Sequence, residues 1–248
     1  MRISFCITCM NRLFHLNRTI IDNLNLINEF NKTHEDKFNI SLCNYDSKDD
    51  LDEFVQTNLQ LYLHNNTLTY FRIYNKKFFN RSHAKNIAHK YANGDVVINL
   101  DCDNILRYDV LLFIYDTFNE LTNNYTINDV YIWDNLYMGF LGMSKKNFVL
   151  LGGYNEKILT YGYEDIELRK RIEKHIGCKD KLLPEQFNYD ETCVIHHDDD
   201  IRAINDDAGA YNYDKNISEN NNIQIMEYYI MNNIKNPNEY NNIVFGEI

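Results

Sequence analysis

Apolar and polar positions follow two different rhythms along the first hundred residues. Four apolar runs are typical of buried strands, and they cover residues 2–8, 39–43, 67–74 and 96–100. Three segments between them repeat apolar residues at helical spacing, over residues 13–27, 51–61 and 82–91. Asn93-Gly94 follows the third of these helices and is expected to end it as a C-cap. Strands that alternate with helices in this way predict βαβ units and a parallel sheet.

The second half of the chain continues the pattern less regularly. Strands are predicted over residues 129–133, 136–143 and 193–197. Helices are predicted over residues 110–121, 145–151 and 164–175, and Gly152-Gly153 closes the second of them. The Asn- and Tyr-rich stretch 212–248 is predicted to wrap the core and to hold a helix near residues 223–234. The fold class that follows is α/β, a single Rossmann-like domain whose mostly parallel sheet is flanked by helices.

Composition and charge limit the classes of partner. Of the 248 residues, 44% are hydrophobic, which is enough for a sizeable core. The net charge of -11 argues against nucleic acid and against an anionic membrane as partners. No apolar run reaches the ~18 residues of a membrane span, and the N-terminus turns polar too soon for a signal peptide, so we expect a cytoplasmic protein. The cysteines are expected as free thiols, with Cys6 and Cys9 on or beside a strand rather than on zinc.

Asp101 and Asp103 follow the apolar strand at residues 96–100, with one residue between them. In open parallel sheets, ligands bind beyond the carboxyl ends of the strands, so these acids share a rim with residues 8–12 and Asp46. Hard divalent cations prefer carboxylate oxygens, and a cation there would bind the diphosphate of a sugar nucleotide. The alternative is a pair of solvated turn acids, because D-x-D alone is a weak signal. The position after a buried strand favours the metal site.

Glu164 and Asp165 form a second acidic group, at the predicted start of a helix behind Gly162. One interpretation is a carboxylate base that removes a proton from an acceptor hydroxyl. The other is ordinary helix N-terminal acids, which the helix dipole favours. The flanking Tyr161 and Tyr163 suit stacking on the apolar face of a sugar.

His196 and His197 lie at the end of the late strand. A histidine there can complete a metal site that two aspartates begin. Adjacent strand residues point to opposite faces, so only one of the two is expected to face the ion. A solvated polar turn is the alternative.

Arg81 and Asp46 are candidates for contacts with a nucleotide. Arg81 lies at a helix start and matches bidentate recognition of phosphate oxygens, although it also fits a solvated helix entry capped by Asn80 or Ser82. Asp46 follows the second strand, where it is either an acceptor for a uracil NH or only a turn residue.

Taken in order, these blocks resemble the β-1,4-galactosyltransferase group of the GT-A glycosyltransferases and, more loosely, glycosyltransferase family 2. The first three matching blocks are residues 7–12 (ITCMNR), 79–86 (FNRSHAKN) and 101–103 (DCD). The fourth runs from Gly139 to residue 165 and includes Ser144-Lys145, Gly152-Gly153-Tyr154 and residues 162–165 (GYED). The late residues 194–197 (VIHH) match as well. Together they span about residues 3–200. The Asp-x-Asp alone is weak, whereas the ordered set is specific.

The resemblance implies a GT-A fold and an inverting transferase that uses a UDP-sugar and Mn²⁺ or Mg²⁺. By position, Asp101 and Asp103 fall at the metal and donor site, with Asp103 the more direct ligand. His197 falls on the metal histidine of that group, with His196 as the alternative. The nucleotide-binding blocks contain Thr8, Asn11, Arg12 and Arg81.

The resemblance also assigns roles on the acceptor side. Asp165 falls on the catalytic base, and Glu164 falls on the neighbouring acid that binds the acceptor. Tyr161 stands where that group has a tryptophan near donor and acceptor, and Gly162-Tyr163 stands where it has Gly-Gly. These two departures bear on the identity of the sugar and on the shape of the acceptor site.

The expected organisation is one GT-A domain over residues 1–248. Residues 1–104 form a nucleotide-binding half that ends in D-x-D, residues 105–200 an acceptor-binding half, and residues 201–248 a C-terminal extension packed on the core. The expected activity is transfer of a sugar from a UDP-sugar to an acceptor hydroxyl on a glycan or glycoprotein. The rival interpretations are a retaining glycosyltransferase, a nucleotidyltransferase, and an inactive carbohydrate-binding module with this fold.

Overall fold

The computed structural model describes residues 1–34, 38–119, 126–133, 140–159, 162–182, 194–195 and 215–241. Within these residues one sheet has the strand order β3-β2-β1-β4-β6-β5-β7. The strands are β1 (Ile3–Cys9), β2 (Phe38–Tyr45), β3 (Leu68–Ile73), β4 (Val96–Asn99), β5 (Val130–Trp133), β6 (Leu141–Ser144) and β7 (Lys179–Leu182). β3, β2, β1 and β4 are parallel, β6 is antiparallel to both of its neighbours, and β5 and β7 are parallel to each other. The mostly parallel α/β sheet predicted from the sequence is confirmed.

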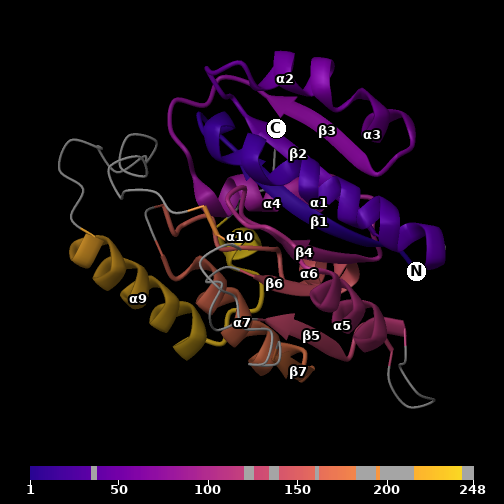
Figure 1. The fold of residues 1–248 in the computed structure, drawn as a ribbon. Coiled ribbons are helices and arrows are strands. Elements are labelled where there is room, and N and C mark those ends of the chain that lie inside the picture. The colour runs from indigo at the N-terminus through magenta and orange to yellow at the C-terminus, as the bar shows by residue number, and fades with distance from the viewer. Residues whose placement is uncertain are drawn as a thin grey trace.

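Helices cover both faces of this sheet (Figure 1). One face packs against α1 (Leu13–His34), α2 (Leu51–Asn58), α3 (Gln60–His64) and α5 (Tyr108–Asn119). The other face packs against α4 (Arg81–Tyr91), α6 (Lys145–Leu150) and α7 (Glu164–His175). α9 (Lys215–Met231) lies beside α7, and α10 (Pro237–Tyr240) follows it.

The alternation of side chains along β1 creates the two cores. Phe5 and Ile7 pack with the apolar stripe of α1, whereas Cys6 packs with α4 on the opposite face. Cys9 points to the face of α1, so Cys6 and Cys9 enter different cores. Both thiols are free and buried, and they lie on the strand, as predicted.

Most of the predicted elements are present, with shifted ends. The helix predicted over residues 51–61 is divided into α2 and α3 at Leu59. The strand predicted over residues 136–143 begins at Leu141 as β6, and residues 136–139 lie outside the described residues. The helix expected near residues 223–234 begins earlier, as α9, and ends at Met231. Gly152 and Gly153 close α6 with left-handed backbone, as predicted.

The predicted C-cap at Asn93-Gly94 is wrong. α4 ends at Tyr91, the C-cap residue is Ala92 in an extended conformation, and Gly94 does not have a positive φ. A Cβ on Gly94 would lie 2.5 Å from the carbonyl oxygen of Val96 and 2.7 Å from the amide of Ser4. The glycine is therefore needed for the close approach of β4 to β1, because any side chain would separate the strands.

None of the helices among the described residues is both long enough and apolar enough to cross a membrane.

Candidate active site

The loops after β1 and β2 meet at the carboxyl ends of the parallel strands. Thr8 pairs in register with Cys43 near the ends of the two strands. Beyond them, Asn11 has a left-handed backbone with φ of 54°. Its amide donates to Ser47 Oγ at 2.6 Å, and its Oδ1 accepts from the amide of Lys48 at 2.6 Å. Two of the predicted rim segments are therefore joined by hydrogen bonds.

Asp46 is buried in the second of these loops, in a left-handed conformation with φ of 56°. Its carboxylate accepts from Lys48 Nζ at 2.8 Å and from the amide of Lys76 at 2.9 Å, and it lies 3.4 Å from Arg72 Nη2. Burial raises the pKa of Asp46, but these donors outweigh it and hold the pKa below its ordinary value. These contacts agree with the role of Asp46 as a turn residue, whereas its contact with a uracil stays a prediction.

The D-x-D turn follows β4 on the same rim. Asp103 is buried, and its Oδ2 lies 3.2 Å from Arg12 Nη2 of the first loop. Asp101 accepts from Asn99 Nδ2 at 3.1 Å, and its carbonyl closes the turn by accepting from the amide of Asn104. Thr8, Asn11, Arg12, Asp46, Asp101 and Asp103 thus all lie on one rim, where the sequence predicted them.

Two side chains of α1 hold the backbone of this turn from the other side. Thr19 Oγ1 donates to the carbonyl of Cys102 at 2.7 Å, and Asn23 Nδ2 donates to the carbonyl of Asn104 at 2.9 Å. Asn23 Oδ1 also accepts from the amide of Leu106. Neither residue was predicted from the sequence, although polar side chains on the apolar face of a helix are a signal of such a role.

Residues 194–195, the described part of the late strand predicted over residues 193–197, lie beside the D-x-D turn. Val194 forms an antiparallel bridge with Asn104, and the amide of Ile195 donates to the carbonyl of Asp103 at 2.8 Å. Ile195 directly precedes His196 and His197 in the chain, and both histidines lie outside the described residues. Among the residues that the structure describes, no group of three or more His, Cys, Asp or Glu side chains is placed to hold a metal.

The second acidic group begins α7, behind a tight turn. Gly162 and Tyr163 both have a positive φ, of 88° and 72°, so the chain reverses sharply into the helix. Glu164 is buried, and its Oε1 accepts from Lys85 Nζ of α4 at 2.8 Å. Glu164 Oε2 is also buried and has no hydrogen-bond partner among the described residues. Tyr161, the predicted sugar-stacking residue, lies outside the described residues.

Glu164 and Asp165 form an acid pair, and electrostatic interactions connect this pair with the D-x-D turn. Burial raises the pKa of Asp165, and repulsion from Glu164 raises it further. Burial also raises the pKa of Asp101, which interacts with Lys85, Asp103 and Glu164. For Glu164 the attraction of Lys85 outweighs burial and lowers its pKa. Charges from β4, α4 and α7 therefore act on one another in one region, as the predicted active site requires.

Arg81 lies at the first position of α4, capped by Asn80, whose Oδ1 accepts from the amide of His83 at 3.0 Å. Its charge lowers the pKa of Glu164, so it belongs to the same electrostatic region. Lys85, one turn further along α4, was not singled out from the sequence. In the sequence, Lys85 is marked by its place as a basic residue in the matching block of residues 79–86. Its partner Glu164 is 79 residues away, so the sequence does not reveal their contact.

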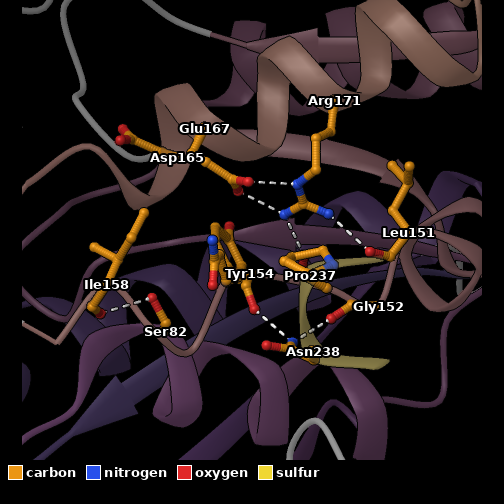
Figure 2. A network of polar contacts seen from close by, with 12 residues as sticks. Ser82, Leu151, Gly152, Tyr154, Ile158, Asp165, Glu167, Arg171, Pro237 and Asn238 are labelled. Carbon is orange, nitrogen blue, oxygen red and sulfur yellow. Dashed lines mark hydrogen bonds and ion pairs between the residues drawn. The ribbon is translucent and has the colours of Figure 1, made fainter. Parts of the chain in front are cut away.

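The segment between α6 and α7 is held by a buried network (Figure 2). Arg171 donates to both carboxylate oxygens of Glu167 and to the carbonyls of Leu151 and Gly153. From α10, Asn238 Nδ2 donates to the carbonyls of Gly152 and Tyr154. This network fixes the position of α7, and with it the acid pair, relative to the sheet.

Asn86 of α4 binds the same segment from the sheet side. Its Oδ1 accepts from the amide of Tyr154 at 2.7 Å, and its Nδ2 donates to Glu156 Oε1 at 2.8 Å. Ser82, one turn earlier, donates to the carbonyl of Ile158. One face of α4 is therefore bonded to the segment that leads into α7.

Comparisons with known proteins agree with this arrangement. Residues 125–197 match the family model described as the N-terminal domain of galactosyltransferase. This segment contains Glu164, Asp165, His196 and His197. It begins at residue 125, so it does not include the D-x-D turn at residues 101–103. No curated protein sequence is significantly similar to the chain.

Solved structures share the fold at low sequence identity. The Pyrobaculum calidifontis mannosyltransferase PcManGT, in complex with GDP-Man and Mn²⁺, has a TM-score of 0.56 and 16% identity, over 74% of this chain and 55% of that one. S. aureus TarS 1-349 has a TM-score of 0.54 and 14% identity, over 74% of this chain and 58% of that one. TarS 1-349 in complex with UDP has a TM-score of 0.54 and 12% identity, over 93% of this chain and 72% of that one. The match with this chain thus covers less than two thirds of the length of each of the first two structures.

The fold is the GT-A fold, which this chain shares with solved glycosyltransferase structures. Within this fold, the segment that carries the acid pair resembles the galactosyltransferases. The predicted resemblance is confirmed to GT-A glycosyltransferases in the fold and to galactosyltransferases over residues 125–197.

Proposed function

We propose that this protein is an inverting, metal-dependent glycosyltransferase that moves a sugar from a UDP-sugar to an acceptor hydroxyl on a glycan or glycoprotein. The observation that most supports the proposal is the position of Lys85 between the acids of the D-x-D turn and those at the start of α7. This side chain bonds Glu164 and interacts electrostatically with both Asp101 and Asp165, so the donor-side acid and the acceptor-side acids act on one region. The UDP and GDP-Man/Mn²⁺ complexes of the structural neighbours support a nucleotide-sugar donor and a divalent ion.

The residues present fit a divalent cation. Asp103 offers a carboxylate to a cationic partner, Arg12, and Asp101 lies in the same turn, so the donor set is of the hard-oxygen type that Mn²⁺ or Mg²⁺ prefers. The backbone pairing of Ile195 with Asp103 supports His197, or His196, as a further ligand because both follow Ile195 in the chain. When bound, the ion supplies charge that stabilises the leaving diphosphate.

On the donor side, we assign Thr8, Asn11, Arg12, Asp46 and Arg81 to the nucleotide. Arg12 and Arg81 suit phosphate oxygens because a guanidinium donates two parallel hydrogen bonds. We place Tyr161 against the transferred sugar. We further assign residues 1–104 to the donor half, residues 105–200 to the acceptor half and residues 201–248 to the C-terminal extension.

On the acceptor side, Asp165 removes the proton from the attacking hydroxyl. The acceptor oxygen forms a bond to the anomeric carbon while the bond from that carbon to the phosphate oxygen breaks, and the electron pair leaves with UDP. The raised pKa of Asp165 makes it a better base than an ordinary aspartate. Glu164 stays ionised beside Lys85, and its unpartnered Oε2 is available to an acceptor hydroxyl.

The test is release of UDP from a panel of UDP-sugars, with and without Mn²⁺, followed by the anomeric configuration of the product. Inversion, together with Mn²⁺-dependent UDP affinity in calorimetry, is the expected result. Retention of configuration would instead place the chain among the retaining enzymes. Binding of saccharides without any release of UDP would identify an inactive carbohydrate-binding module and overturn the proposal.

A further inference from the structure

Lys85 is a buried cation whose side chain makes one hydrogen bond among the residues that the structure describes. It is 5% exposed, its Nζ lies 2.8 Å from Glu164 Oε1, and it lies 5.3 Å from the centre of the Tyr154 ring. A buried ammonium is costly to desolvate and is retained only where a partner offsets its charge. Glu164 is that partner, and its side chain is as buried as that of Lys85.

The two carboxylate oxygens of Glu164 differ in their hydrogen bonding. Lys85 occupies one carboxylate oxygen, whereas Oε2 is buried and has no partner among the described residues. Folding normally satisfies such an atom, so an acceptor left open in a buried carboxylate calls for an explanation. The carboxylate is also kept ionised, because the attraction of Lys85 lowers its pKa against the effect of burial.

The side chains around the pair restrict where Lys85 can place its charge. On α4, Ser82 and Asn86 are bonded to the segment of residues 154–158, which fixes the helix face from which Lys85 extends. Asp101 and Asp165 interact with its charge from the D-x-D turn and from α7. Moving the ammonium therefore changes its position relative to both acids.

We propose that Lys85 is a positioning residue that holds Glu164 through one oxygen and so leaves Oε2 free for a hydroxyl of the acceptor. The inference rests on the proposed function, in which Glu164 binds the acceptor, and adds the requirement for a cation that takes one oxygen only. An ammonium meets this requirement because it is a compact point charge. A guanidinium does not, because its fork binds both oxygens of a carboxylate.

The first test is Lys85→Arg, which keeps the buried charge and changes its geometry. The variant should fold and bind UDP with Mn²⁺ within about twofold of the parent, while its KM for the acceptor rises about tenfold or more. Lys145→Arg is the matched control, because Lys145 donates to the carbonyl of Ala92 and does not contact the acid pair. A parent-like acceptor KM in Lys85→Arg would show that any cation suffices and would overturn the proposal.

The second test does not depend on whether Lys85→Arg folds. Lys85→Ala leaves room for a small cation, and ethylammonium chloride should restore a low acceptor KM, whereas guanidinium chloride at the same millimolar concentration should not. Equal rescue by both cations, or by neither, contradicts the proposal. Absence of transfer by the parent enzyme would instead refute the proposed function, so the two failures are distinguishable.

Discussion

Arg171 and Glu167 form a completely buried ion pair on the inner side of α7, with Nη2 2.6 Å from Oε2 and neither side chain exposed (Figure 2). The same guanidinium donates to the carbonyls of Leu151 and Gly153. One side chain thus connects the helix that carries the acid pair to the segment that follows α6. The active-site geometry depends on this connection although neither residue is assigned a chemical role.

Arg171→Met should destabilise the fold by about 3–5 kcal/mol, because it leaves the charge of Glu167 buried and unpaired. Urea denaturation measures the loss. The double variant Arg171→Met/Glu167→Leu should lose less than the single variant, since it removes both charges. A double variant that is less stable than the single one would contradict this explanation, because the two differ only in the unpaired charge of Glu167.

Gly153→Ala should cost about 2–4 kcal/mol, since its Cβ would lie 2.3 Å from Asn86 Oδ1 and its φ is 66°. Gly177→Ala is the matched control, with φ of 69° and nothing within 4 Å of the added Cβ. The control should show only the backbone cost of about 1 kcal/mol. Equal losses of unfolding free energy in the two variants would mean that the contact with Asn86 is unimportant.

Asp165→Asn should abolish transfer and at the same time stabilise the protein. A carboxyl whose pKa is raised by folding destabilises the native state at a pH above that pKa, and asparagine removes the charge. The expected gain is on the order of 1 kcal/mol, seen as a rise in Tm. UDP affinity with Mn²⁺ should be unchanged. Full transfer activity in the variant would remove Asp165 from its role as base.

Asp46→Asn should weaken the fold in a pH-dependent way. The pKa of Asp46 is lowered by folding, so its stabilisation is complete above the ordinary value of 3.8 and is lost as the pH falls through the folded value. At pH 7 the variant should lose about 1–3 kcal/mol, because the donors to this buried side chain face a weaker, uncharged acceptor. The gap between parent and variant in denaturant titrations should narrow below pH 4. A gap that is constant with pH would show that ionisation of Asp46 does not contribute.

Asp103→Asn should reduce Mn²⁺-dependent UDP affinity about tenfold or more, because an amide is a poorer ligand for a hard cation than a carboxylate. Asp109→Asn is the control, since Asp109 pairs with Arg107 at the surface beyond the turn. Calorimetry with and without Mn²⁺ gives both affinities. Equal behaviour of the two variants would exclude Asp103 from the metal site.

Much of the candidate site was predictable because its residues follow strands. Asp101 and Asp103 follow β4, and residues 8–12 cover the end of β1 and the loop after it, so the parallel sheet alone puts them on one rim. The error at Gly94 has a different cause. An Asn-Gly after a helix predicts a C-cap, but here the glycine is required by the approach of a neighbouring strand, which local sequence does not reveal.

The sequence by itself determined the alternation of strands and helices, the polar rim after the parallel strands and the acids at the start of α7. These features depend on the spacing of apolar residues and on the residues preferred at helix starts, and both are patterns within a few neighbouring residues. The tertiary structure alone decided the antiparallel β6, the bond between Lys85 and Glu164, and the burial of Arg171. These contacts join segments far apart in the chain or depend on which face is covered. Their energies come from desolvation and close packing, which no local pattern encodes.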